Sequence, residues 1–281
     1  MVQPNRDHIR RQFEEVGQGH VFTFWDRLGE PERNELIADL ASVNVAQLPS
    51  LARLAASEDH QSHVPDDLTP AEVVRPEAVN PETVRRGQSL LAEGKIAAFT
   101  VAGGQGTRLG FDGPKGAFPI SPVRNKPLFQ LFAECILGTA QTYGREIDWY
   151  IMTSPVNHDA TRQFLESNGY FGLAPQRVHF FQQGVMPAFD REGKILLDQP
   201  HRLALSPDGH GGSLLALATS GMLADMAAKG VEHLSYFQVD NPLVHCLDPA
   251  FLGLHDKTGS EMSSKTLPKA DDLEKVGNFA M

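Results

Sequence analysis

The apolar positions of the chain follow two patterns, one before and one after about residue 95. In the first part they recur three or four residues apart, as Ile37, Leu40 and Val43 do, and this spacing predicts amphipathic helices over residues 1 to about 60. In the second part short apolar runs alternate with segments of helical spacing. Strands that alternate with helices form parallel sheets covered by helices, so the pattern predicts an α/β fold with an N-terminal helical extension.

The second part contains four predicted strands and the helices between them. The first strand, IAAFTV, has apolar or β-branched side chains throughout, as a strand buried on both faces of a sheet does. We expect a parallel, doubly wound sheet, whose ligand site lies at the carboxyl ends of its strands. The predicted strands span residues 96–101, 148–153, 177–181 and 234–239, and the predicted helices span residues 82–93, 128–136, 157–167 and 213–229.

Domain boundaries follow from the same pattern. Four prolines between residues 64 and 81 interrupt any helix and predict an extended linker. We therefore expect residues 1–94 to form a helical segment with a proline-rich linker, and residues 95–281 to form the core. Within the core, Glu192 and Gly193 predict the turn of a short hairpin.

Composition narrows the class of protein. Of the 281 residues, 41% are hydrophobic and 21% are charged, which is ordinary for a soluble globular protein. No apolar run is long enough to span a membrane, and the polar N-terminus lacks the apolar core of a signal peptide, so we expect a cytoplasmic protein. The net charge of −10 argues against a nucleic-acid surface. It still allows a nucleotide ligand, because a few local cations outweigh carboxylates screened beyond about 10 Å.

Candidate chemistry begins where the first strand ends, in the segment VAGGQGTRLGFDGPKG. Gly103, Gly104 and Gly106 remove side chains where the backbone turns, so a phosphate can approach the amide groups. Arg108 adds a planar fork and Lys115 a mobile point charge, and both suit phosphate oxygens. An ordinary surface connection is the alternative, but such turns seldom combine three glycines with two cations after a buried strand. We therefore expect an anion site here.

Two common glycine-rich motifs do not fit this segment. A P-loop requires Gly-Lys followed by Ser or Thr, which the chain lacks. The dinucleotide fingerprint G-x-G-x-x-G fails because its last position, counted from Gly104, is Leu109, and Gly110 comes one residue late. An NAD-linked oxidoreductase is therefore disfavoured.

Three further segments follow predicted strands or open a predicted helix. Gln183 offers a donor and an acceptor, which suit either the edge of a uracil ring or nearby backbone. Gly209 leaves room for a base or a sugar, and His210 could bond a ligand hydroxyl or phosphate, or belong to a plain turn. Asp240 directly follows the last strand, where a carboxylate often holds a divalent cation on phosphate, although it could instead cap the next turn.

Together these segments resemble the sugar-nucleotide pyrophosphorylases. The order G-G-x-G-T-R-L, then P-K, then KPLFQLFAE, is similar to the UDP-N-acetylglucosamine pyrophosphorylase branch of the UTP-dependent uridylyltransferases. FFQQG, PDGHGG, VDNPL, WYIMTS, and KTLP followed by EKVG also look like signatures of that family, and they extend the match from about residue 96 to 277. The resemblance implies a Rossmann-like, doubly wound mixed sheet of the nucleotide-diphospho-sugar transferase type.

The resemblance also implies an activity and a set of roles. The chain would transfer a uridylyl group from UTP to a sugar 1-phosphate, with N-acetylglucosamine 1-phosphate as the expected acceptor and Mg²⁺ as cofactor. Arg108 and Lys115 would stabilise the phosphates in the transition state, and Asp240 would bind Mg²⁺ and the substrate. The other implied substrate contacts are Val101, Ala102, Gly103, Gly104, Gln183, Gly209 and His210, with Gln183 at the uracil.

Two departures from the family pattern keep alternatives open. His210 stands where N-acetylglucosamine-specific relatives resemble PDGNGG, and a histidine there looks more like enzymes of UDP-glucose or of a broader range of UDP-sugars. The chain also stops at Met281, whereas the family's sheet continues into further sugar-binding residues and a C-terminal domain. We therefore expect an N-terminal fragment whose core is incomplete at its C-terminus. A UTP-binding module without catalysis is a further alternative.

Overall fold

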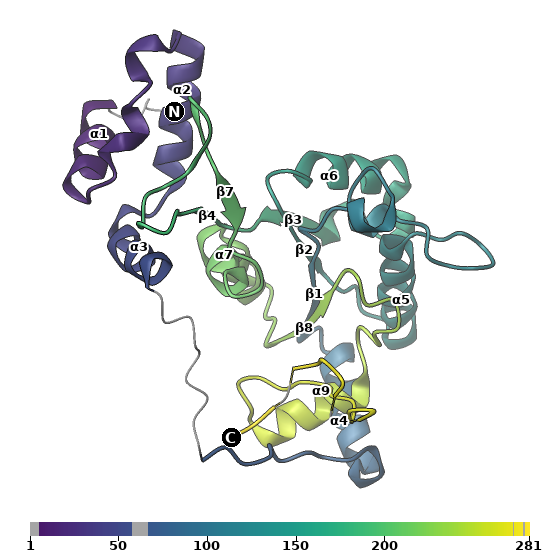
Figure 1. The fold of residues 1–281 in the computed structure, drawn as a ribbon. Helices are drawn as coiled ribbons and strands as arrows, with labels where there is room; N and C mark the ends of the chain where they lie inside the picture. The colour runs from purple at the N-terminus through teal and green to yellow at the C-terminus, as the bar shows by residue number, and fades with distance from the viewer. Residues whose placement is uncertain (1–5, 58–66, 272, 278) are drawn as a thin grey trace. The chain divides into compact units, whose positions relative to one another are not determined.

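The computed structural model describes residues 6–57, 67–271, 273–277 and 279–281, and it divides into two compact units (Figure 1). Unit 1 combines residues 1–64 with residues 184–209, and unit 2 combines residues 65–183 with residues 210–281. Within the described residues, no helix is both long and apolar enough to cross a membrane.

Unit 2 is built on a four-stranded sheet with the order β3-β2-β1-β8. Its strands are β1 (Ile96–Val101), β2 (Trp149–Thr153), β3 (Val178–Gln182) and β8 (His233–Gln238). All three pairings are parallel, and each strand agrees with its expected position to within one residue at either end. The doubly wound α/β fold is thereby confirmed. Antiparallel pairs occur in separate two-stranded ribbons rather than within this sheet.

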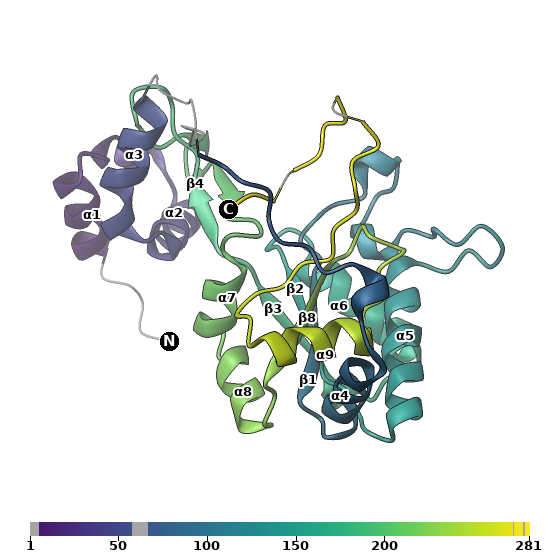
Figure 2. The ribbon, with the colours of Figure 1, turned by 90° about the horizontal axis from the view of Figure 1, so that it is seen from below.

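Helices cover both faces of the sheet, as Figure 2 shows. Because successive residues of a strand point to opposite faces, Ala98 and Trp149 belong to one core and Phe99 and Tyr150 to another. The first core is shared with α4 (Pro81–Ala92), α5 (Leu128–Tyr143), α6 (His158–Ser167) and α9 (Pro249–Thr258), and the second with α7 (Ser213–Thr219) and α8 (Met222–Ala228). Burial on both faces explains the continuous apolar run of β1.

The strand order reverses between β1 and β8. From β1 the chain moves through β2 to β3 on one side, and it later returns to place β8 on the other side of β1. In an open parallel sheet the loops diverge at such a reversal and leave a crevice beyond the carboxyl ends of the strands. The loops that follow β1 and β8 are the glycine-rich segment and the segment of Asp240. The fold therefore brings these two predicted site segments to one edge.

Unit 1 joins the N-terminal helices to the excursion between β3 and α7. The buried side chain of Gln18 donates to the carbonyl oxygen of Gly193 at 2.8 Å and accepts from the amide of Ile195 at 3.0 Å. The apolar side chains of Ile195 and Leu203 lie in the same core as those of the helices. The elements are α1 (Arg6–Glu15), α2 (Glu30–Ser42), α3 (Leu48–Ala56), β4 (Val185–Pro187), β5 (Leu197–Gln199), β6 (Arg202–Leu203) and β7 (Leu205–Pro207).

This division differs from the boundary expected between residues 94 and 95. The α4 helix packs against α9, and the crossing is so close that a Cβ on Gly87 would lie 1.9 Å from the carbonyl oxygen of Pro249. Residues 65–94 thus fall in unit 2. The predicted linker begins at residues outside the described part. Its described part contains a short 3₁₀ turn at Pro76–Ala78 and an isolated antiparallel bridge between Pro70 and Ala280.

One predicted helix is interrupted. We expected a single helix over residues 213–229, but α7 ends at Thr219 and α8 begins at Met222. Gly221 between them has a left-handed φ of 80°, which ends the first helix. The predicted hairpin turn is confirmed, because the amide of Asp190 donates to the carbonyl oxygen of Lys194 at 2.9 Å.

A cluster of charges lies at the opposite edge of the sheet from the glycine-rich segment. Asp148 directly precedes β2 and its side chain is 8% exposed. It accepts hydrogen bonds from Arg177 at 2.8 Å, His179 at 2.6 Å and Lys229 at 2.8 Å. Three donors compensate for the loss of water around this carboxylate. The cluster ties β2, β3 and the end of α8 together.

Acidification is expected to weaken unit 2 by titrating Asp148. Burial alone would raise the pKa of this carboxyl, but hydrogen bonds from His179 and Lys229 and the charges of Lys229 and Arg177 lower it to about 2 from the usual 3.8. A lowered pKa stabilises the fold at pH values above the unfolded pKa. That contribution, about 2 kcal/mol, is lost as the pH falls from about 4 to about 2.

Urea denaturation between pH 7 and pH 2 checks this expectation. Asp148→Asn should be less stable than the wild type at neutral pH and should lose less free energy of unfolding on acidification. Asp198→Asn, which changes an exposed carboxyl of unit 1, should keep the wild-type acid dependence. An unchanged acid dependence in Asp148→Asn would contradict the expectation.

Candidate active site

The glycine-rich segment leaves β1 and folds back on itself. Two short 3₁₀ turns, Thr107–Leu109 and Lys115–Ala117, lie within it. The amide of Lys115 donates to the carbonyl oxygen of Gly104 at 3.1 Å, so the second turn returns to the end of β1. A Cβ on Gly104 would lie 3.5 Å from Cε of Lys115. The lysine side chain therefore lies beside the first glycines of the loop.

Asn157, the residue before α6, holds the start of this loop. Its side chain is fully buried, and Nδ2 donates to the carbonyl oxygens of Ala102 at 2.9 Å and Gly104 at 3.2 Å. Because C=O and the following N–H point in opposite directions across a trans peptide, the amides of Gly103 and Gln105 point away from Asn157. Within the described residues these amides have no protein acceptor. They remain available to an anion.

The ammonium of Lys115 lies 3.1 Å from Oδ2 of Asp240. The two side chains are 24% and 49% exposed, so the pair is accessible to a ligand. The alternative role for Asp240, capping the next turn, is taken by its neighbour, because Oδ1 of Asn241 accepts from the amide of Leu243 at 3.2 Å. A ligand phosphate could thus draw Lys115 from Asp240 and leave the carboxylate for a cation.

Gln183 extends β3 by one residue toward the loop. Its amide donates to the carbonyl oxygen of Thr153 at 2.8 Å, and its side chain is buried. A Cβ on Gly103 would lie 2.7 Å from Nε2 of Gln183, so a larger residue at 103 would displace the carboxamide. In the described part of the chain no protein group hydrogen-bonds to this carboxamide, which leaves its donor and acceptor for a ligand.

The other predicted residues, His210, Arg108 and Gly209, lie in three different environments. His210 is exposed, and its Nδ1 hydrogen-bonds to the hydroxyl of Tyr236 on β8. Arg108 is exposed on the first turn of the loop and has no side-chain partner among the described residues. Gly209 has a left-handed φ of 65° and is the last residue of unit 1. Unit 2 therefore brings together Gly103, Gly104, Lys115, Gln183 and Asp240 at the ends of β1, β3 and β8.

Asp240 is the group that fits a metal ion at this edge. In the described chain, no set of three or more His, Cys, Asp and Glu side chains is arranged to hold one. Mg²⁺ usually keeps several waters and binds one or two carboxylates together with substrate phosphates. A single carboxylate beside free amides and a lysine suits a cation that arrives with a nucleotide, and it does not suit a permanent metal centre.

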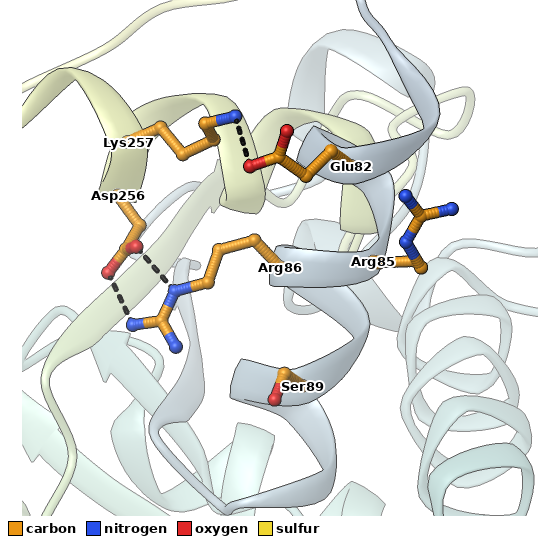
Figure 3. Close-up of a pocket in the computed structure, with 6 residues that line it drawn as sticks. All are labelled: Glu82, Arg85, Arg86, Ser89, Asp256 and Lys257. Carbon is orange, nitrogen blue, oxygen red and sulfur yellow. Dashed lines mark hydrogen bonds and ion pairs between the residues drawn. The ribbon is translucent and has the colours of Figure 1, made fainter.

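A separate hollow of about 340 Å³ lies between α4 and α9 (Figure 3). Four of its five charged side chains are paired, because Arg86 binds both carboxylate oxygens of Asp256, at 2.6 and 3.1 Å, and Lys257 lies 3.2 Å from Glu82. None of the predicted site residues lines it. We interpret this hollow as part of the joint between the two helices.

Sequence reasoning missed Asn157 and Tyr236. An asparagine before a predicted helix is usually interpreted as its N-cap, but this side chain makes no capping hydrogen bond. It donates instead to backbone carbonyl oxygens that lie 53 and 55 residues earlier in the chain. Tyr236 lies within a predicted strand, where a tyrosine is expected to be buried in the core, yet it is 43% exposed. No local pattern distinguishes either residue.

Comparison with known proteins shows the family of the chain. The family model of UTP–glucose-1-phosphate uridylyltransferase matches residues 51–280. UDP-N-acetylglucosamine diphosphorylase 2 of Arabidopsis thaliana is 35% identical in an alignment that covers 98% of the chain. UDP-N-acetylglucosamine pyrophosphorylase of Saccharomyces cerevisiae is 33% identical in an alignment that covers 96% of it. These alignments cover 58% and 60% of the relatives, so the chain spans about three fifths of their length.

Solved structures show the same fold. The inhibitor complex of the uridine diphosphate N-acetylglucosamine pyrophosphorylase from Trypanosoma brucei superposes with a TM-score of 0.83 at 27% identity, over 98% of this chain and 59% of that one. A point mutant of UDP-glucose pyrophosphorylase from Leishmania major has a TM-score of 0.61 at 17% identity, over 87% of this chain and 47% of that one, and shows a likeness of fold alone.

Proposed function

The chain belongs to the UTP–glucose-1-phosphate uridylyltransferase family, and from this premise we propose that it binds UTP at the carboxyl edge of its parallel sheet and transfers the uridylyl group to a sugar 1-phosphate. The observation that carries the proposal is the convergence of Lys115, Asp240, Gln183 and the free amides of the glycine-rich loop. These groups supply what a uridine nucleotide needs: donors for phosphate, a carboxamide for the base and a carboxylate for its cation.

The proposed reaction is an in-line displacement. A phosphate oxygen of the sugar 1-phosphate attacks the α-phosphorus of UTP, the bond from that phosphorus to the bridging oxygen breaks, and pyrophosphate leaves. Such transfers need positioning and charge stabilisation rather than a covalent protein nucleophile.

Each residue has one task in this scheme. Negative charge grows on the transferred phosphate and on pyrophosphate during the reaction. It would be stabilised by the amides of Gly103 and Gln105 and by the side chains of Lys115 and Arg108. Asp240 would hold Mg²⁺, which neutralises phosphate charge when bound. Gln183 would hydrogen-bond the edge of the uracil. The strands keep these groups in place before the substrate arrives.

N-acetylglucosamine 1-phosphate is the proposed acceptor. The support is that the Arabidopsis and yeast relatives are named for UDP-N-acetylglucosamine and align along nearly the whole chain. The UDP-glucose pyrophosphorylase structure from Leishmania major is 17% identical and supports the fold alone. The family description names glucose 1-phosphate, which is therefore the alternative acceptor.

Pyrophosphate release from UTP and Mg²⁺ tests the proposal directly. N-acetylglucosamine, glucose and galactose 1-phosphates are offered in turn, and calorimetry measures UTP binding in parallel. We expect release with N-acetylglucosamine 1-phosphate above the other two. Binding of UTP without release of pyrophosphate would favour a nucleotide-binding module without catalysis. Binding of NADH in place of UTP would contradict the proposed uridine-nucleotide site.

Gln183→Leu is expected to weaken the preference for UTP over CTP by roughly tenfold, because the carboxamide would no longer read the edge of the base. Calorimetric affinities for both nucleotides check this. Gln182→Leu is a matched control, since Gln182 is the exposed neighbour and should keep the preference. A preference unchanged in Gln183→Leu would remove this residue from the base site.

A further inference from the structure

Tyr236 makes a contact that the proposed transfer does not use. It lies in β8 with 43% of its surface exposed, and its hydroxyl hydrogen-bonds to Nδ1 of His210. The two rings meet edge to face with centroids 6.1 Å apart. The Tyr236 ring also packs edge to face on the buried ring of Phe99, at 5.3 Å. Tyr236 therefore connects the edge strand β8 and its neighbour β1 to an exposed loop residue.

The hydroxyl decides which nitrogen of His210 is left for a ligand. A neutral imidazole has one donor and one acceptor nitrogen, and the partner of the first sets the role of the second. A phenol that donates to Nδ1 leaves the ring proton on Nε2, whereas an Nδ1–H that donates to the phenol oxygen leaves Nε2 as an acceptor. Burial raises the pKa of Tyr236, so the phenol keeps its proton at neutral pH and has a hydrogen to donate. With the phenol as donor, His210 offers an Nε2–H donor.

We infer that Tyr236 is a positioning residue that holds His210 in its Nε2–H form, so that the imidazole donates to an oxygen of the substrate. The ligand named here rests on the proposed function, whereas the tautomer is a property of the ligand-free chain. A donor at this position recognises a phosphate or sugar oxygen, and a plain turn would need no such partner. The contact therefore gives the histidine of PDGHGG a defined role.

Nitrogen-15 spectra of the histidine rings test the tautomer. In the wild type we expect a protonated Nε2 and an Nδ1 that accepts a hydrogen bond, with the signals assigned by their loss in His210→Asn. Tyr236→Phe keeps the ring on Phe99 and removes the hydroxyl, so it should shift His210 toward a mixture of tautomers. A protonated Nδ1 in the neutral wild-type ring, or no change in Tyr236→Phe, would overturn the inference.

A double-mutant cycle tests the link to the ligand. Affinity for UDP-N-acetylglucosamine, measured by calorimetry, should fall roughly fivefold in Tyr236→Phe and less than about twofold when the same change is made in His210→Ala. An equal loss in both backgrounds would show that Tyr236 does not act through His210. If the wild-type chain does not bind UDP-N-acetylglucosamine, the proposed function and the ligand part of the inference fail together, and the spectra still decide the tautomer.

Discussion

Lys115→Ala is expected to lower the rate of UDP-sugar formation by about 100-fold or more. The ammonium lies 3.1 Å from Asp240 and beside the first glycines of the loop. A phosphate in the loop would replace Asp240 as its partner and would gain negative charge during transfer. Alanine at position 115 lacks the ammonium, so the phosphate loses its cationic partner when its negative charge is largest. Steady-state pyrophosphate release measures the loss.

A matched lysine controls for the removal of an ion pair. Lys95 is 33% exposed and lies 2.6 Å from Glu232, but the two residues precede β1 and β8 and so lie at the amino ends of the strands. Lys95→Ala should keep the rate within about twofold, because exposed ion pairs contribute little. Lys115→Arg should recover only part of the loss, since a guanidinium fork does not replace a point charge. Near-normal turnover in Lys115→Ala would refute its catalytic role.

Asn157→Leu is expected to destabilise unit 2 by about 3 kcal/mol, because it leaves buried hydrogen-bonding groups without partners. The carbonyl oxygens of Ala102 and Gly104 would lose their donor, and the amide of Ser154 would lose its acceptor. The loop would no longer be held with its amides turned outward, so affinity for UTP should fall as well. Urea denaturation and UTP calorimetry measure the two effects separately.

Two variants sharpen the prediction for Asn157. Asn157→Asp keeps the shape but directs a carboxylate oxygen at two carbonyl oxygens, so it should weaken UTP binding at least as much as leucine does. Asn168→Leu changes an exposed asparagine at the other end of α6, whose Nδ2 donates to the carbonyl oxygen of Phe164, and it should cost less than about 1 kcal/mol. Wild-type UTP affinity in a folded Asn157→Asp variant would show that the loop does not depend on this anchor.

The strands and the site loops were predictable because each leaves a local mark. A strand buried on both faces needs apolar or β-branched side chains throughout, as IAAFTV has. A tight loop needs glycine where a Cβ would collide, as at Gly103 beside Gln183. Asp240 was identified because it directly follows a strand. The parallel order of the sheet then brought these residues to one edge.

The rest depends on partners far apart in the chain. Asn157 reaches backbone 53 and 55 residues away, and the carboxamide of Gln18 binds Gly193 and Ile195 in the segment that completes unit 1. Neither contact follows from periodicity, so the expected domain boundary missed this segment. The break between α7 and α8 depends on the left-handed φ of Gly221, which a helical pattern of apolar residues conceals.

The central claim is that the loops at the carboxyl ends of β1, β3 and β8 form one uridine-nucleotide site. Amide hydrogen exchange with and without UTP and Mg²⁺ tests it most directly. The account predicts that UTP protects residues 102–116, the amides near Gln183 and the segment after Asp240, while the helices around the α4 and α9 hollow remain unchanged. Protection at that hollow, with exchange in the glycine-rich loop unaltered by bound UTP, would contradict it.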